Sequence, residues 1–276
     1  MGHEFLLLDK KDSIATITLN SPETLNALSE EMIGGLQQVF DELETDRDVR
    51  SVIIRARGRA FCAGHDLKQL TRGRQSEDGG KAYFRKIFDM CSAMMMSITR
   101  LPQPVVAQVQ GPAVAAGCQL VATCDLAVAG NSARFGVNGV NIGLFCSTPM
   151  VALSRNLPRK LAFEMLTSGR LIDADEACRM GLVNKAVGDE DLNVQTRSLA
   201  ERLASKLGTA VRIGKRAFYE QAEMGLADAY GHTGDVMVQN MMFRDTSEGI
   251  SAFLDKRPPD WPGQQPAPGG DFDQRS

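Results

Sequence analysis

The stretch GPAVAAGCQLVATCDLAVA, residues 111–129, decides the fold expected for this chain. It follows PVVAQVQG, an apolar run that is typical of a buried strand. Small residues then form a turn, AAGCQLVATC has the composition of a buried helix, and DLAVAG indicates the next strand. Strand, helix and strand in such close succession predict an α/β layer structure. One polar side chain, Gln119, stands inside this stretch of small and apolar residues.

A second stretch, AFCAGHDLKQL at residues 60–70, has the same order of strand, glycine-containing loop and helix. Asp66 followed by Gln69 is the pattern of a helix N-cap with its capping-box partner. Backbone N–H groups at the start of a helix have no partner within the helix and carry a partial positive charge. Two such loops that converge could hold a carbonyl oxygen as it becomes an enolate. Either loop by itself is also explained as a simple tight turn.

The rest of the chain divides into an alternating part and a helical part. We expect two short strands around a polar turn at residues 10–13, a helix that begins at Ser29, and a helix over 81–100 that is ended by Pro102. From Arg159 onward the pattern is almost entirely helical. The helices expected there are one that begins at the capping pattern Asp173–Glu176 and stops at Gly181, and others within 189–207, 209–224 and 226–254.

Composition excludes several classes of protein. The 276 residues are 43% hydrophobic and 24% charged, and the net charge is −3. A chain with this charge lacks the overall positive potential that is typical of proteins that bind nucleic acid. The apolar runs stop well short of the ~18 residues of a transmembrane span. The six cysteines form no CxxC pair and the three histidines are dispersed, so we expect no metal site. Unpaired thiols are typical of the reducing cytoplasm, where we expect this protein.

Taken together, AFCAGHDL, GPAVAAGCQLVATCDLAVA and ARFG strongly resemble the crotonase superfamily, also called the enoyl-CoA hydratase/isomerase family. LNSPETLNALS near the start and EGISAFLDKRPP near the end are similar to that family's ends. The resemblance therefore covers roughly residues 5–257. The stretch NIGLFCSTPMVALSR looks closest to a subgroup of enoyl-CoA hydratase domain-containing proteins.

The resemblance implies an α/β fold, a crotonase-like spiral of ββα units over 1–195. It implies a helical trimerisation region over 196–258, and composition predicts disorder in the Pro- and Gly-rich tail 259–276. The implied ligand is an acyl-CoA thioester, which is substrate rather than cofactor, and the implied assembly is a homotrimer or hexamer. The thioester oxygen would bind the N–H groups of His65 and Ala116. The binding residues implied are Ala63, Gly64, His65, Asp66, Leu67, Lys68, Ala116 and Gly117.

Basic side chains gather around the first loop, and coenzyme A carries several phosphate charges. Each of these side chains would also be ordinary on a solvated surface. They are Arg55, Arg57, Arg59, Lys68, Arg72 and Arg74.

The chain departs from the hydratases at the two positions that carry their chemistry. Those enzymes use two glutamates, and the resemblance puts these at Gln119 and Gly139, so both carboxylates are absent. An amide does not titrate in a useful range, and glycine offers only backbone. Acid–base groups contribute about 10² to 10⁴ each, so we expect hydration of an enoyl-CoA to be very slow. Two classes stay open: an acyl-CoA hydratase or isomerase with another acid or base, and a non-catalytic relative that binds acyl-CoA or pairs with active subunits.

Few other groups could replace the glutamates. The imidazole of His65 is the best candidate base because its ordinary pKa is near neutral. Asp66 is better explained as an N-cap and Asp125 as a structural carboxylate. Cys146 lacks a histidine partner nearby in sequence. Further polar residues along the chain are Asn138, Asn141, Glu164 and Asp173.

The turn AAG differs from the family in one more way. Ala115 and Ala116 stand where the family usually has glycines. If the turn needs a positive φ, alanine costs about 1 kcal/mol or shifts the turn. The pair of N–H groups would then be slightly distorted.

Overall fold

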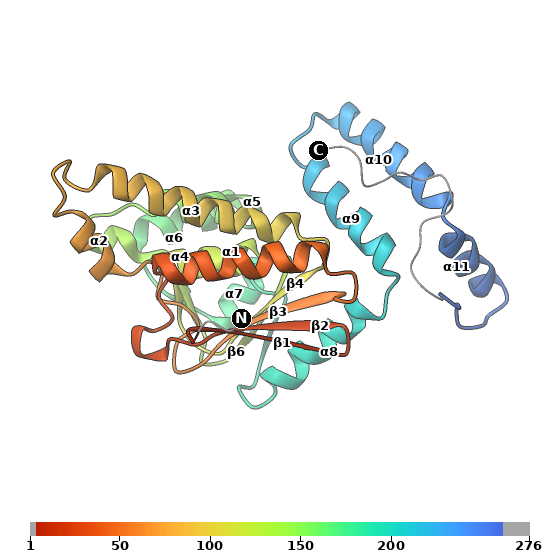
Figure 1. Ribbon diagram of the computed structural model, residues 1–276, viewed down its shortest axis with the longest axis horizontal. Coiled ribbons are helices and arrows are strands. Elements are labelled where there is room, and N and C mark those ends of the chain that lie inside the picture. Colours follow the sequence, from red (N-terminus) through yellow and green to blue (C-terminus); the bar gives the residue numbers. More distant parts are fainter. Residues whose placement is uncertain (1–3, 262–276) are drawn as a thin grey trace. The chain divides into compact units, whose positions relative to one another are not determined.

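This computed structural model describes residues 4–261, so most of the tail expected at 259–276 lies outside the described residues (Figure 1). The chain divides into two compact units, one up to Glu201 and one from Arg202. The first unit contains every strand found within residues 4–261, and the described part of the second unit is helical. No described helix is both long and apolar enough to cross a membrane.

The main sheet of the first unit has six strands in the order β1-β2-β3-β4-β6-β9. β1 and β2 are antiparallel around a turn at Asp12 and Ser13, both with positive φ, and the other pairs are parallel. Every residue of β4 is buried, as expected for a parallel strand covered on both faces. The strands are β1 (Leu6–Lys11), β2 (Ile14–Leu19), β3 (Ser51–Ala56), β4 (Val105–Val109), β6 (Leu126–Gly130) and β9 (Lys185–Val187).

A smaller sheet of three strands carries the second loop of interest. It contains β5 (Ala113–Val114), β7 (Arg134–Gly136) and β8 (Ile172–Asp173), in the order β5-β7-β8. An isolated parallel bridge joins Cys62 to Ala113, so the first loop lies against the edge of this sheet.

Two long helices, α1 (Glu30–Thr45) and α3 (Lys81–Arg100), lie side by side along the sheet (Figure 1). Ser29 caps α1 by accepting from the Met32 N–H at 3.2 Å, and Gln37 of α1 donates to Ser97 of α3 at 2.9 Å. The expected helix starts and ends are confirmed here. The other helices of this unit are α2 (Leu67–Gly73), α4 (Ala116–Thr123), α5 (Ser147–Asn156), α6 (Arg159–Ser168), α7 (Ala174–Met180) and most of α8 (Leu192–Ala204), with short 3₁₀ turns η1 (Pro22–Thr24) and η2 (Asn138–Ile142).

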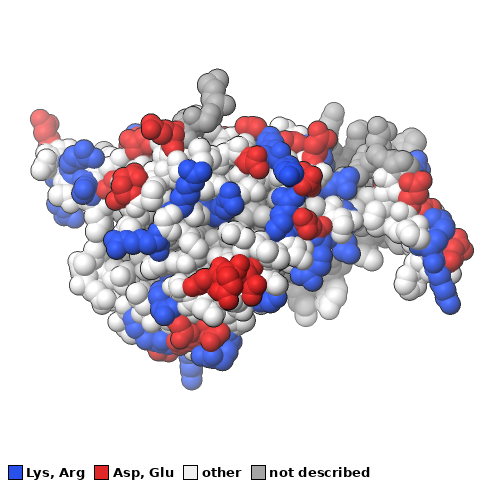
Figure 2. Space-filling view, turned by 90° about the horizontal axis from the view of Figure 1, so that it is seen from below, with Lys and Arg blue, Asp and Glu red and all other residues white. Residues whose placement is uncertain are grey.

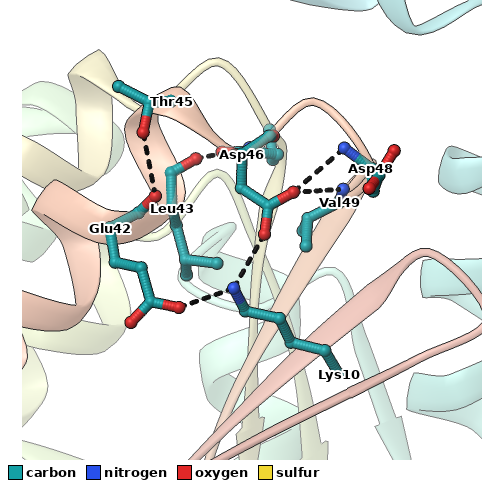
Figure 3. Close-up of polar contacts among 8 residues, drawn as sticks. Lys10, Glu42, Leu43, Thr45, Asp46, Asp48 and Val49 are labelled. Atoms are coloured by element: carbon teal, nitrogen blue, oxygen red, sulfur yellow. Dashed lines mark hydrogen bonds and ion pairs between the residues drawn. The ribbon is translucent and has the colours of Figure 1, made fainter.

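An ion-pair cluster ties β1 to the end of α1 (Figure 3). Lys10 Nζ lies 2.6 Å from Glu42 Oε1 and 2.7 Å from Asp46 Oδ2. Asp46 also accepts from the N–H groups of Asp48 and Val49 at 3.0 and 3.3 Å. The hydrogen bond from Lys10 lowers the pKa of Asp46, and this cluster is structural. Elsewhere on the surface, the face in Figure 2 mixes both signs of charge.

The expectation of an almost entirely helical chain after Arg159 was incomplete. β8 and β9 lie in that region, but two or three residues are too short to show strand alternation. The helix expected over 226–254 is two helices, α10 (Leu226–Met241) and α11 (Arg244–Leu254), after α9 (Gly208–Gln221). The break is at Phe243, a buried residue, and no proline or glycine marks it in the sequence. The start and stop of α7 are confirmed, since Asp173 accepts from the Glu176 N–H at 2.8 Å and Gly181 is left-handed. The reciprocal half of the capping box is not formed, because the Glu176 carboxylate pairs with Arg170 at 2.6 Å.

Candidate functional site

The two loops predicted to converge lie against each other. The Val114 N–H donates to the Cys62 carbonyl at 3.0 Å, which joins the end of the first loop to β5. A Cβ built on Gly64 would lie 2.9 Å from the Ala115 Cβ and 3.3 Å from the Ala116 nitrogen. A Cβ on Gly117 would lie only 2.1 Å from the Cys62 carbonyl oxygen. Glycine at both positions is therefore what lets the two backbones meet.

The backbone donors at this meeting point include the N–H groups of His65 and Ala116, neither of which has an acceptor among the described residues. Ala116 is the first residue of α4, where no intrahelical acceptor exists. Nearby, the Ala63 N–H donates to Leu25 at 3.0 Å and the Ala115 N–H donates to Gly136 at 2.8 Å, whereas the Gly117 N–H, at the second position of α4, also has no acceptor among the described residues. The fold thus leaves two adjacent donors for a ligand oxygen.

The backbone at Ala115 has φ +50° and ψ −121°. The turn does use a positive φ at this residue, as the family's glycine suggested. Ala116 is helical and needs no glycine. A non-glycine residue in such a region costs of order 1–3 kcal/mol and persists where the surroundings impose it.

Gln119 lies one turn after Ala116, on the same side of α4. Its side chain is 5% exposed, and its Oε1 atom is buried with no donor among the described residues. An unsatisfied buried acceptor costs about 1–3 kcal/mol. All eight residues of α4 are buried, so the Gln119 Oε1 atom is an unpaired acceptor in a largely apolar layer.

Gly139 is buried in η2, and the space beside it is filled. A Cβ there would lie 2.3 Å from the Leu144 carbonyl oxygen and 2.8 Å from Cys146 Sγ. The Leu144 N–H in turn donates to the Gly139 carbonyl at 3.0 Å. The sequence showed that a carboxylate is absent at 139, but not that the following loop leaves no room for one.

His65 is held as a neutral imidazole. Its ring packs edge-on against Phe88 with centroids 5.4 Å apart, and both ring nitrogens are buried without a hydrogen-bond partner among the described residues. Burial lowers the pKa of His65, and the nearby backbone of Leu28 offsets this only in part. A neutral ring can accept a proton, so the side chain keeps the chemistry of a base.

Asp66 is the N-cap of α2, as predicted. Its Oδ1 accepts from the N–H groups of Lys68 and Gln69 at 2.8 and 3.1 Å. The capping box was wrong, because the Gln69 side chain instead accepts from the Glu30 N–H at 2.9 Å and donates to Glu31 at 2.8 Å. Leu67 and Lys68 are exposed beyond this cap.

The other sequence candidates have structural partners. Asp125 accepts from the Val105 N–H at 2.7 Å, Asn141 donates to the Gly169 carbonyl at 3.2 Å, and Glu164 pairs with Arg170 at 2.9 Å. Burial raises the pKa of Cys146, which makes its thiol a poor nucleophile. Of the basic set, Arg55 and Arg57 donate to Thr18 and Asn20 at 3.0 and 3.1 Å. Among the described residues, no group of three or more His, Cys, Asp or Glu could hold a metal ion.

The comparisons with known proteins agree with this geometry. Residues 9–264 match the family model for Enoyl-CoA hydratase/isomerase. The chain belongs to this family, and the predicted crotonase fold and superfamily are confirmed.

Among curated relatives, the chain is 46% identical over 250 residues to "Enoyl-CoA hydratase domain-containing protein 3, mitochondrial" of Homo sapiens, covering 91% of this chain and 81% of that protein. It is 44% identical over 255 residues to the protein of the same name from Xenopus laevis, and the match covers 92% of this chain and 85% of that protein. A crystal structure of enoyl-CoA hydratase from Mycobacterium smegmatis matches with a TM-score of 0.90 and 48% identity over 94% of this chain and 99% of that one. The crystal structure of the human enoyl-CoA hydratase domain-containing protein 3 matches with a TM-score of 0.88 and 44% sequence identity. The match covers 93% of this chain and 100% of that one.

Proposed function

We propose that this protein binds an acyl-CoA with its thioester oxygen between the N–H groups of His65 and Ala116. The observation that carries the proposal is that these two adjacent donors are unpaired while the nearby N–H groups of Ala63 and Ala115 are paired. Such donors stabilise negative charge on a carbonyl oxygen, and each is worth about 3 kcal/mol in a developing oxyanion. Membership of the Enoyl-CoA hydratase/isomerase family supports an acyl-CoA as the ligand.

The residues around the donors have distinct parts in this proposal. Gly64 and Gly117 allow the two backbones to approach, and Ala63 is fixed by Leu25. Asp66 holds the start of α2, from which the exposed Leu67 and Lys68 would lie along the coenzyme. Coenzyme A is substrate here, and no separate cofactor enters the proposal.

The chemistry beyond binding is restricted. Gln119 cannot exchange protons, and the Leu144 carbonyl occupies the place of a side chain at 139. We therefore expect hydration far below the rate of a two-glutamate enzyme, and a non-catalytic acyl-CoA-binding protein fits the site best. The second candidate is a slow hydratase or isomerase in which the neutral imidazole of His65 is the base. The observation that supports this candidate is that both ring nitrogens are buried without a hydrogen-bond partner among the described residues.

The proposal is tested by titrating the protein with acetyl-CoA and crotonyl-CoA in a calorimeter while loss of enoyl absorbance is followed separately. We expect binding and very slow turnover. Gly117→Ala would place a Cβ 2.1 Å from the Cys62 carbonyl oxygen, so it should push the two loops apart and abolish most thioester binding. Gly34→Ala is the matched control, because nothing lies within 4 Å of its Cβ position in α1, and it should bind as the wild type does. No heat with either ligand would refute the proposal, and turnover at an ordinary enzyme rate would refute its non-catalytic form.

The assembly and location remain proposals. We propose a homotrimer or hexamer. The cytoplasmic location expected from the free cysteines is also still a prediction, and the vertebrate relatives carry the word mitochondrial in their names.

A further inference from the structure

We propose that Asn26 is a positioning residue, whose buried side chain holds the loop 57–65 in the conformation that aims the His65 N–H at the thioester oxygen. The inference rests on the proposed function, because it takes that oxygen to bind the N–H groups of His65 and Ala116. It goes further by naming a residue outside the ligand-binding set that determines how strongly the bound carbonyl group is polarised.

The side chain of Asn26 is a buried amide that joins two parts of the chain. It is 0% exposed, and its Oδ1 accepts from the Ser21 N–H at 2.9 Å. Its Nδ2 donates to the carbonyl oxygens of Arg57 and Ala60, both at 2.9 Å. These two carbonyl groups lie on either side of Gly58, so one amide closes the turn that leads out of β3 into the loop. A buried amide is stable only with its partners in place, so the side chain fixes the start of the loop.

The backbone on both sides of Asn26 holds the other end of the loop. Asn26 has φ +53° and Leu25 has φ +56°, and asparagine is among the few residues other than glycine that enter this left-handed region readily. The Leu25 carbonyl accepts from the Ala63 N–H at 3.0 Å, and the Leu28 N–H donates to the Gly64 carbonyl at 2.7 Å. The next N–H along the loop is that of His65, which has no acceptor among the described residues.

A second amide acts on the same turn from the opposite side. Gln110, which precedes β5, donates from its Nε2 to the carbonyl oxygens of Gly58 and Ala60 at 3.2 and 3.0 Å. The Ala60 carbonyl thus receives two amide donors. A backbone N–H stabilises charge on a carbonyl oxygen only at hydrogen-bond distance and alignment, and a misplacement of ~1 Å can cost about 10²-fold in rate. Loss of the Asn26 amide should therefore let the His65 N–H move out of alignment.

The experiment measures the polarisation of the bound carbonyl group. Asn26→Asp keeps the shape of the side chain but sets an oxygen against the carbonyl oxygens of Arg57 and Ala60. The ligands are butyryl-CoA labelled with ¹³C at the thioester carbonyl, and free coenzyme A, which lacks that carbonyl. In infrared difference spectra, wild type should lower the stretching frequency of the bound carbonyl, and the variant should lose at least half of this shift. Calorimetry should show about tenfold weaker binding of butyryl-CoA, with the affinity for free coenzyme A changed by less than about twofold.

Gln103→Glu is the matched control. Gln103 is also a buried amide, and its Nε2 donates to the carbonyl oxygens of Leu43 and Asp46 at 2.7 and 3.0 Å, at the end of α1. The same exchange of nitrogen for oxygen should destabilise the fold and leave the carbonyl shift at its wild-type size. If Asn26 only stabilised the fold, the two variants would behave alike in both measurements.

Two further variants keep the inference testable if Asn26→Asp does not fold. Asn26→Gly takes the left-handed φ without strain and loses only the side chain, so it should show the same loss of shift. Gln110→Met removes the second, half-buried amide and should reduce the shift in the same direction.

The outcomes separate this inference from the proposed function. A full carbonyl shift in a folded Asn26 variant would overturn the inference and leave the proposed function standing; if neither Asn26 variant folds, a full shift in Gln110→Met would do so. If wild type does not bind butyryl-CoA, or binds it without any shift, the proposed function fails and this inference fails with it.

Discussion

The two positions at which the family resemblance places glutamates differ in the room they leave for a side chain. At position 119 a glutamine, nearly the shape of a glutamate, fits inside the buried helix α4. At Gly139 the space itself is gone, since the Leu144 carbonyl would lie 2.3 Å from any Cβ. A glutamate introduced at 119 would keep the shape of the side chain, whereas a glutamate introduced at 139 would require the 144–146 loop to move.

The filled space at Gly139 predicts a large effect of a small substitution. Gly139→Ala should lower the free energy of unfolding by about 2 kcal/mol or more, because backbone cannot give way cheaply at this separation. Gly34→Ala is the control, since nothing lies within 4 Å of its Cβ position in α1, and it should stabilise by up to about 1 kcal/mol. Denaturant unfolding of both variants measures this. An unchanged midpoint for Gly139→Ala would show that the loop does not fill the site.

Replacing Ala115 by glycine should make the folded protein more stable. At φ +50° the alanine is strained, so we expect Ala115→Gly to raise the free energy of unfolding by about 1 kcal/mol. Ala116→Gly should do the opposite, because it replaces a helical residue that has no such strain. Thermal unfolding of the pair distinguishes strain at Ala115 from a general effect of glycine. A loss of stability in both variants would contradict the strained turn.

His65 predicts a dependence of stability on pH. Burial lowers the pKa of the His65 imidazole in the folded state. As the pH falls below about 6.5, the ordinary histidine pKa, the imidazole therefore binds a proton more readily in the unfolded chain than in the folded chain. This contribution is fully present above pH 6.5 and is lost as the pH falls toward the lowered pKa. His65→Gln removes it, so wild type should lose more stability than the variant between pH 7.5 and 5.5. Parallel melting curves would contradict the prediction.

At the scale of elements, α2 is held by polar contacts at its ends together with the partial burial of Leu70 against the core. None of its residues is buried, and its first turn is held by Asp66 with bonds of 2.8 and 3.1 Å. Gln69 then joins it to α1 through Glu30 and Glu31. These polar contacts add to the backbone bonds of Cys62, Ala63 and Gly64 that position the loop presenting the His65 N–H.

Removing the cap of α2 should weaken ligand binding. We expect Asp66→Ala to cost about 1 kcal/mol of helix stability, to speed amide hydrogen exchange in α2, and to lower thioester affinity severalfold. Asp66→Asn keeps an oxygen acceptor and should behave nearly as wild type. An exchange pattern in Asp66→Ala identical to that of wild type would show that the cap is dispensable.

At the scale of the whole molecule, the helical second unit carries exposed apolar side chains. Phe253 is 84% exposed, Leu226 77% and Tyr230 74%. Large apolar side chains on a surface are a mark of association when they gather on one part of a protein. They support the proposed trimer or hexamer.

Assembly can be tested through one of these side chains. Light scattering after size exclusion should give three or six times the mass of one chain for wild type. Phe253→Asp should reduce that mass, because a charge would be buried in the interface, while Phe253→Leu should retain it. A single-chain mass for wild type would refute the proposed assembly.

Much of the fold could be predicted from the sequence because its signals are local. The apolar stripe of α1, the cap at Ser29 and the runs of β3, β4 and β6 are fixed by neighbours in the chain. The strands β8 and β9 could not be predicted, because pairing with strands distant in sequence defines them.

The same division holds at the site. By itself the sequence determined which residues occupy positions 119 and 139, and hence that no carboxylate is present there. Only the tertiary structure decided that the Gln119 oxygen lacks a partner, that the 144–146 loop fills the space at Gly139, and that the donors of His65 and Ala116 stay unpaired. The physical reason is that the sequence specifies each residue type directly. Whether a polar atom has a hydrogen-bond partner, and whether a space is filled, depends on every segment that packs around it.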